Sequence, residues 1–291
     1  MTLPDSNSLL CDVNSLGVAT LTLNRTEKNN AFDAQMINDL IEQLSLLSAN
    51  TNVRCLVLRA NGEHFSAGAD LQWMQSMAAQ PHSANIRDAE QLAKLMSTLD
   101  NFPHPSIAVV QGCAFGGALG LICCCDIAIA NNDAQLCLSE VKLGLIPATI
   151  GPYVCRAIGV RQARRYMLTA ERIDALTAKQ LGLLHLVVEP SALDLQTQLL
   201  VQSLLANSPK AQTLAKQLCK RCDESSIDAV LIQCTSDLIA DIRVSPQGQE
   251  GLAAYFERRA PNWVQPVDEV TDAASSQNKL DSDNGKESKD E

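Results

Sequence analysis

The stretch "PSIAVVQGCAFGGALGLICCCDIAIAN", residues 105–131, decides the fold of this chain. Its first part, "PSIAVVQG" (105–112), is an apolar run opened by prolines, and it predicts a buried strand because proline breaks a helix. A glycine-rich corner then leads into an apolar helix, and "CDIAIAN" (125–131) predicts a further strand. Strand, glycine corner, helix and strand in this order indicate an α/β fold, in which helices cover a sheet.

A second corner of the same kind, "FSAGADL" (65–71), lies upstream of this stretch. Two strands are predicted before it, at 17–24 and 53–58, and Asp33 caps a helix between them. The apolar residues of that helix fall at helical spacing: Met36, Ile37, Leu40, Ile41, Leu44 and Leu47. The polar stretch after the corner has no clear periodicity as far as about Arg87, where a helix to about Leu99 is predicted.

Three regions follow from the composition along the chain. Residues 1–195 form a core that carries both corners, and it includes the loop 138–151 and a short strand in "LHLVVEP". Residues 196–265 are predicted to be a helical C-terminal region. Residues 266–291 have almost no bulky apolar side chain and predict a disordered acidic tail, because such a segment cannot bury a core.

Charge and cysteine content exclude several classes of function. The 291 residues carry a formal net charge of −10, which argues against nucleic-acid binding because that relies on dense Lys and Arg. No signal peptide or membrane span is visible, so a cytoplasmic protein is expected. The 11 cysteines do not suggest a disulfide framework, and no Cys or His cluster has metal-binding spacing. We expect Cys123, Cys124 and Cys125 to be small buried hydrophobic residues.

The two glycine corners are candidates for binding an oxygen atom. Glycine lets the backbone approach a ligand closely, and the start of a helix leaves N–H groups without partners. Two such corners side by side would direct two N–H donors at one carbonyl oxygen, as in an oxyanion hole. Phosphate binding is a second interpretation, although neither corner matches a dinucleotide or P-loop pattern. Close packing of helix against strand is a third.

The corners also occur within a longer series of motifs. "NRTEKNNAFD" (24–33), "FSAGADL", "QGCAFGGALGL" (111–121), "CDIAIA" and "LSEVKLGLIP" follow one another in this order. Together they resemble the enoyl-CoA hydratase/isomerase (crotonase) family over about residues 10 to 260. The resemblance implies a spiral of ββα units with a helical C-terminal region that builds a homotrimer or a dimer of trimers. It also implies an acyl-CoA thioester as substrate and no separate cofactor, since CoA is part of the substrate.

The resemblance assigns catalytic roles to three residues. Ala69 and Gly117 match the positions whose N–H groups bind the thioester oxygen while an enolate forms, and we expect Gly117 to tolerate no side chain. Glu140 matches a catalytic glutamate, and its largely apolar surroundings predict a raised pKa.

Other residues match positions that bind the CoA or acyl part of the substrate. Ala31 and Ala67 match backbone positions beside adenine, and Arg25 and Lys28 are candidates for phosphate contacts. Asp70, Leu71 and Gly116 lie at the corners themselves, and Gln72 stands where the family often has a lysine. If residues 140–142 are extended, Lys142 shares a face with Glu140 and meets a distal carboxylate of the substrate or shifts the pKa of Glu140; otherwise it faces solvent.

One position departs from the pattern of two-glutamate hydratases. Gly120 stands where such enzymes carry their second glutamate, three residues after the oxyanion glycine. Within the family, "SEVKLGLIPATI" and "AFGGALGLICCCDIA" resemble bacterial 3-methylglutaconyl-CoA and γ-carboxygeranoyl-CoA hydratases. A hydro-lyase of leucine and isovalerate breakdown is therefore expected, with Glu140 acting alone or helped by the substrate's own distal carboxylate or by a loop acid, Asp88 or Glu90. A Δ3,Δ2-enoyl-CoA isomerase that uses a single carboxylate and a non-catalytic acyl-CoA-binding protein are the alternatives.

Overall fold

The computed structural model of the chain describes residues 8–264. The tail predicted for residues 266–291 lies outside the described residues. Within them, no helix has both the length and the apolar character needed to cross a lipid bilayer.

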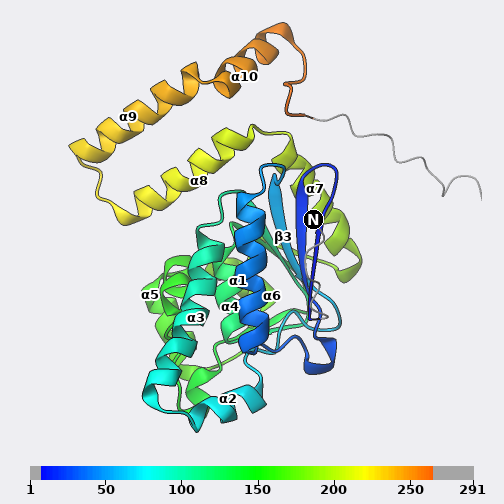
Figure 1. Ribbon diagram of the computed structural model, residues 1–291, viewed down its shortest axis with the longest axis vertical. Coiled ribbons are helices and arrows are strands. Elements are labelled where there is room, and N and C mark those ends of the chain that lie inside the picture. Colours follow the sequence, from blue (N-terminus) through cyan, green and yellow to red (C-terminus); the bar gives the residue numbers. More distant parts are fainter. Residues whose placement is uncertain (1–7, 265–291) are drawn as a thin grey trace, which may run out of the picture.

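A six-stranded sheet forms the centre of the molecule (Figure 1), in the order β1-β2-β3-β4-β6-β9. The first strand is antiparallel to its neighbour and the others are parallel. The strands are β1 (Leu9–Val13), β2 (Val18–Leu23), β3 (Cys55–Ala60), β4 (Ser106–Val110), β6 (Ile127–Asn131) and β9 (Leu186–Val188). The α/β class and the five strands after β1 agree with the predictions, whereas the edge strand β1 was not predicted.

A smaller sheet of three short strands carries the glycine corners. Its order is β5-β7-β8, with β5 (Cys113–Phe115), β7 (Gln135–Cys137) and β8 (Ile173–Asp174). Successive strands thus alternate between the sheets: β4 and β6 lie in the large sheet, and β5 and β7 lie in the small one. Helix α4 (Gly117–Cys124) follows β5, and the 3-10 helix η2 (Glu140–Leu143) follows β7. The strands of the small sheet therefore lead into the two parts of the candidate site: β5 ends at α4, and β7 is followed by η2.

Helices cover both faces of the large sheet. One face packs against α1 (Ala34–Ala49), α3 (His82–Asp100), α4 and α5 (Gly151–Thr169), and the other against α7 (Leu193–Leu205). All six predicted apolar residues of α1 are buried, which confirms that helix and its cap, since the Asp33 carboxylate accepts the Met36 N–H. The stretch expected to lack periodicity is instead helical, in α2 (Leu71–Ala78) and the first turns of α3.

The C-terminal helices lie at one end of the molecule (Figure 1): α8 (Pro209–Glu224), α9 (Ala229–Val244) and α10 (Pro246–Glu257). Helix α6 (Ala175–Leu181) precedes β9. Helix α7 crosses the predicted boundary at residue 195. Its Leu200, Val201 and Leu204 pack against the apolar cluster on the sheet, so the core extends to the end of α7.

Candidate active site

The first corner is the middle segment of a three-segment backbone arrangement, between the segment at Phe32 and the second corner. The Phe32 N–H donates to the Gly68 carbonyl at 2.7 Å, and the Asp70 N–H donates to the Phe32 carbonyl at 2.8 Å. This parallel pairing uses the groups of residues 68 and 70, so the N–H of Ala69 points to the opposite side. Gly68 has a φ of +94°, and a Cβ there would lie 3.0 Å from the Phe115 carbonyl oxygen. Glycine is therefore required where the first corner approaches the second.

The second corner lies on the opposite side of the same segment. The Ser66 N–H donates to the Cys113 carbonyl at 3.1 Å, and the Phe115 N–H donates to the Ser66 carbonyl at 3.0 Å. Gly116 then turns the chain into α4 with a φ of +54°, a conformation that side chains rarely adopt. Gly117 is the first residue of α4, so its N–H lies at the helix start.

Two N–H groups at the corners have no acceptor. Among residues 8–264, neither the Ala69 N–H nor the Gly117 N–H donates a hydrogen bond. Phe32 lies next to both donors. Its backbone pairs with the segment at Ala69, and its ring lies 3.4 Å from the position that a Cβ on Gly117 would take. Both donors thus lie close to Phe32 with no acceptor among the described residues, and an oxyanion hole requires free donors of this kind. The same 3.4 Å is ordinary van der Waals contact, so the described residues leave room for a methyl group on Gly117.

Glu140 lies beside the second corner. It begins η2, and its Oε1 is 3.2 Å from the position that a Cβ on Gly116 would take. Its Oε2 is buried and has no hydrogen-bond partner among the described residues. Burial raises the pKa of the Glu140 carboxyl, and a hydrogen bond to its own backbone offsets part of that rise. A carboxyl group in this state can exchange a proton closer to neutral pH than an ordinary glutamate.

The position of the missing second glutamate is closed by apolar side chains. A Cβ on Gly120 would overlap Cγ2 of Ile150 and would lie 2.8 Å from Sδ of Met96. Met96 is 0% exposed and Ile150 is 1% exposed, so neither can move into solvent. Residue 120 therefore faces packed core, and a glutamate there would not reach the corners without rearrangement of α3 or α5.

Three residues proposed as helpers of Glu140 are placed differently from the predictions. Residues 140–142 are not extended but lie in a 3-10 helix, where residues two apart point about 240° from one another. Lys142 is exposed and does not share a face with Glu140. Asp88 and Glu90 lie within α3 and not in a loop. Burial raises the pKa of Asp88, and the neighbouring Trp73 indole opposes part of that rise, whereas Glu90 is exposed.

Arg25 is held by the protein's own carboxylates. Its Nη1 lies 2.9 Å from Oδ2 of Asp33, and its Nη2 lies 3.0 Å from Oδ2 of Asp70. Burial alone would raise the pKa of Asp70, but backbone donors at Trp73 and Gln72 and the charges of Arg25 and Lys28 lower it. The predicted phosphate contact of Arg25 thus competes with two ion pairs that are already formed.

The remaining residues predicted to bind CoA surround the first corner. Lys28 is exposed, and its Nζ lies 3.4 Å from Oε1 of Gln72. Ala31 is buried, whereas Leu71 is 73% exposed at the start of α2. The Ala67 N–H donates to the Asn29 carbonyl at 2.9 Å, so the backbone positions of this region are fixed.

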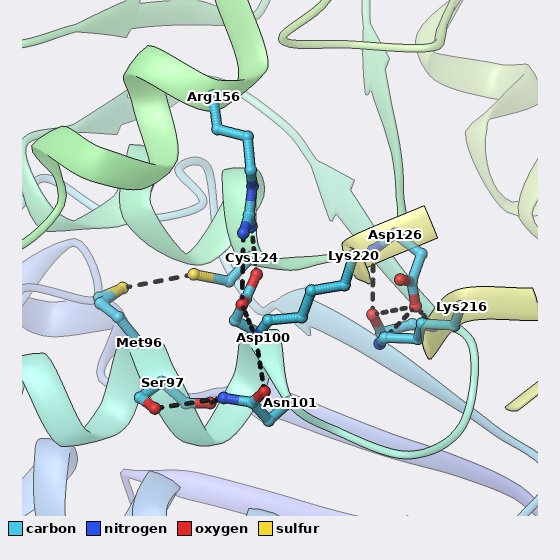
Figure 2. Close-up of polar contacts among 10 residues, drawn as sticks. Met96, Ser97, Asp100, Asn101, Cys124, Asp126, Arg156, Lys216 and Lys220 are labelled. Carbon is cyan, nitrogen blue, oxygen red and sulfur yellow. Dashed lines mark hydrogen bonds and ion pairs between the residues drawn. The ribbon is translucent and has the colours of Figure 1, made fainter. Parts of the chain in front are cut away.

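A separate cleft of about 350 Å³ lies at the other end of α4, between α3, α5 and α8. Figure 2 shows its polar groups, in which Asp100 contacts both Arg156 and Lys220, and Asp126 contacts Lys216. Each of these five charged groups has a partner, so these ion pairs hold α8 against the core. Asp126 also accepts the Ser106 N–H at 2.8 Å, which gives it a structural role between β4 and β6.

Sequence reasoning missed three residues of the site. Phe32 lies inside the motif "NRTEKNNAFD", but nothing in the sequence connects its ring to Gly117. Met96 and Ile150 had no signal at all, because they meet at Gly120 only after α3 and α5 pack on α4. No three His, Cys, Asp or Glu side chains within the described part of the chain converge as metal ligands.

Comparisons with known proteins give one consistent result. A family model described as Enoyl-CoA hydratase/isomerase matches residues 14–266. A crystal structure of an enoyl-CoA hydratase from Shewanella pealeana is 52% identical, with a TM-score of 0.85, over 88% of this chain and 96% of that one. The 2,3-dehydroadipyl-CoA hydratase of Escherichia coli is 32% identical over 84% of this chain and 94% of its own length. A trans-2-decenoyl-[acyl-carrier-protein] isomerase of Streptococcus mutans is 28% identical over 89% and 99%.

Proposed function

The chain belongs to the enoyl-CoA hydratase/isomerase family, and we propose that it is a hydro-lyase that adds water to an α,β-unsaturated CoA thioester. The observation that carries this proposal is Glu140. Its buried, unpartnered Oε2 lies on a residue that touches the corner bearing the free Gly117 N–H. A fold gains no stability from such a carboxyl group, so a role in chemistry accounts for it best.

One carboxyl group suffices for the whole addition. The Ala69 and Gly117 N–H groups donate to the thioester oxygen and draw electrons from the double bond, so Cβ becomes electrophilic. The Glu140 carboxylate takes a proton from water while the water oxygen bonds to Cβ, and the electron pair moves onto the thioester oxygen as an enolate. The protonated Glu140 then returns its proton to Cα and the thioester carbonyl re-forms. Because Cα and Cβ are neighbours, one carboxyl group with two oxygens can serve both atoms.

As the substrate we propose 3-methylglutaconyl-CoA, which would place the enzyme in leucine and isovalerate breakdown. The support is the resemblance of residues 114–128 and 139–150 to hydratases of this class. The E. coli relative is named for a CoA ester whose acyl group also ends in a second carboxylate. The proposed assembly is a homotrimer or a dimer of trimers, and the proposed location is the cytoplasm.

A Δ3,Δ2-enoyl-CoA isomerase is the second candidate. The packing of Ile150 and Met96 against Gly120 favours it, because this packing leaves no room for a second glutamate. Isomerisation needs only one group that removes and returns a proton. The S. mutans relative is named as an isomerase. A non-catalytic acyl-CoA-binding protein would have no use for a buried carboxyl group of raised pKa.

The test offers 3-methylglutaconyl-CoA and a 3-enoyl-CoA separately and follows the absorbance of the conjugated thioester. Hydration lowers this absorbance for the first substrate, and isomerisation raises it for the second. We expect hydration, and we expect Glu140→Gln to lower turnover by about 10²–10⁴-fold, the usual contribution of a general acid–base group. Acyl-CoA binding should persist in this variant, because both N–H donors remain.

The exposed Glu90 supplies the matched control, and Glu90→Gln should keep wild-type turnover. Full activity of Glu140→Gln would assign the chemistry to another group. Loss of hydration in a folded Asp88→Asn variant would show that α3 contributes a second acid. Activity on the 3-enoyl-CoA alone would replace the hydratase by the isomerase.

A further inference from the structure

The guanidinium group of Arg25 joins the two segments that pair at the first corner. Arg25 precedes the 3-10 helix η1 (Thr26–Lys28) and is 19% exposed. Its Nη1 contacts Asp33 at 2.9 Å and also donates to the Ala31 carbonyl at 3.0 Å, while its Nη2 contacts Asp70 at 3.0 Å. Asp70 is 5% exposed, so this second pair is largely removed from solvent.

The two carboxylates occupy matching places in the pairing. Asp33 directly follows Phe32, and Asp70 directly follows Ala69. Phe32 and Ala69 are the residues that bridge the two segments. Arg25 therefore ties the segments together one residue beyond the free N–H of Ala69, at the point where α1 and α2 begin and the chains diverge.

We infer that Arg25 is a positioning residue that holds the Ala69 N–H in line with the thioester oxygen, and that it is not a ligand of the CoA phosphates. The inference rests on the proposed function only in taking an acyl-CoA carbonyl as the group bound at the corners. An arginine suits this place because its planar group can contact two carboxylates and a carbonyl at once, which a lysine ammonium cannot span.

Lys28 provides the contrast within the same segment. It is exposed, and within residues 8–264 its Nζ has a 3.4 Å contact with Gln72 and no ion pair. A cation in this state can meet a phosphate without giving up an ion pair. The two cations near the first corner thus have different tasks: Arg25 orders the backbone and Lys28 remains available to the substrate.

The experiment compares four variants of the full chain: Arg25→Met, Arg25→Lys, Asp33→Asn and Lys28→Met. Asp33→Asn keeps the cap on α1, since asparagine caps as well as aspartate, but removes the charge that faces Arg25. Each variant is checked by thermal unfolding and assayed for kcat and KM. A second readout is the stretching frequency of the thioester carbonyl of bound butyryl-CoA with an isotope label, which reports hydrogen bonding at the oxygen without any reaction.

We expect Arg25→Met and Arg25→Lys to lower kcat by up to about 10²-fold, the effect of a displacement near 1 Å, with KM close to the wild-type value. The carbonyl frequency should move toward that of free butyryl-CoA. Asp33→Asn should also lower kcat and move the carbonyl frequency toward that of free butyryl-CoA. If Arg25→Met does not fold, Asp33→Asn tests the positioning role in its place. Lys28→Met should raise KM and leave the carbonyl frequency unchanged.

A raised KM with normal kcat and an unchanged carbonyl frequency in both Arg25 variants would overturn the inference and restore Arg25 as a phosphate contact. Failure of the proposed function gives a different result. In that case the wild-type protein would not turn over the enoyl-CoA, whereas the carbonyl frequency of bound butyryl-CoA would still report the Arg25 effect.

Discussion

The buried carboxyl group of Glu140 lowers the stability of the folded state when it is ionised. Its Oε2 is buried without a hydrogen-bond partner in the described part of the chain, and burial raises the pKa of the carboxyl group. The ionised form is therefore less stable in the folded protein than in the unfolded chain. Such a group adds nothing to the stability of the fold, which agrees with the catalytic role proposed for it.

This cost predicts how stability depends on pH. Because the folded pKa of Glu140 is above its unfolded value, the wild-type protein loses stability as pH rises from the unfolded pKa to the folded one. The loss is absent below the unfolded pKa and complete above the folded pKa. Glu140→Gln has no such titration, so its stability relative to wild type should increase across this window. Urea unfolding of both proteins from about pH 4 to about pH 8 measures the difference, and a constant or decreasing difference would contradict the prediction.

Helix α4 presents two different ends and one closed side. Its N-terminus carries the free N–H of Gly117, and its C-terminus leads to the ion pairs around Asp126. Of the three cysteines predicted to be buried, Cys124 and Cys125 are buried and Cys123 is only partly buried. Burial raises the pKa of the Cys125 thiol to about 12. Between the ends, Gly120 faces Met96 and Ile150.

The glycines of α4 should respond in opposite ways to the same substitution. Gly120→Ala places a methyl group against Ile150 and Met96, and we expect a loss of about 1–3 kcal/mol in the free energy of unfolding, typical of overpacking. This exceeds the gain of about 0.5–1 kcal/mol from removing a helical glycine. Gly117→Ala meets only the ring of Phe32 at ordinary contact and should not be destabilising. Chemical denaturation of both variants checks the order.

A double-mutant cycle identifies the cause of the Gly120 effect. Ile150→Ala alone should destabilise by about 2–5 kcal/mol, as buried isoleucine truncations do. In the Gly120→Ala background it should cost less, because the smaller side chain relieves the overlap. If the two substitutions changed the free energy of unfolding in a strictly additive way, contact with Ile150 would not be the cause of the Gly120→Ala effect.

The whole molecule leaves an apolar surface on its C-terminal helices. Val230 on α9 is 77% exposed, and Tyr255 and Phe256 on α10 are 79% and 76% exposed. The rings of Tyr255 and Phe256 contact each other, and side chains of this size are rarely left together in water unless another surface covers them. Helix α8 connects this region to the core, where Lys216 and Lys220 pair with Asp126 and Asp100. The arrangement favours contact between copies of the chain.

We therefore expect the protein to form a homotrimer or a dimer of trimers through α9 and α10. Replacing Tyr255 and Phe256 together by serine should give a smaller assembly, because the apolar contact is lost while the ion pairs on α8 remain. Light scattering coupled to size exclusion measures the molar mass. Leu46→Ser, which changes a 40% exposed leucine on α1, serves as control. An unchanged mass for the double variant would place the interface elsewhere.

The sequence by itself determined the elements whose signal is local. Strands β2, β3, β4 and β6 and helix α1 each span five or more residues and were predicted from their own apolar patterns. The edge strand β1 also spans five residues but was not predicted. The three-residue strand β9 was predicted, from the apolar run in "LHLVVEP". Gly116 was predicted to lie at a corner because the sequence is rich in glycine there. Its φ of +54° is one that glycine adopts without strain. Glu140 was identified from its motif, and the raised pKa expected for it is confirmed.

Only the tertiary structure decided the features that join distant residues. Strands β5, β7 and β8 are two or three residues long, so their pairing partners and not their own patterns define them. The N–H of Ala69 is free because Phe32 pairs with the residues on either side of it. Arg25 meets Asp70, and Gly120 meets Met96 and Ile150, across gaps that no local pattern spans. Hydrogen bonds and close packing act between atoms that touch, and which atoms touch is settled only when the whole chain has folded.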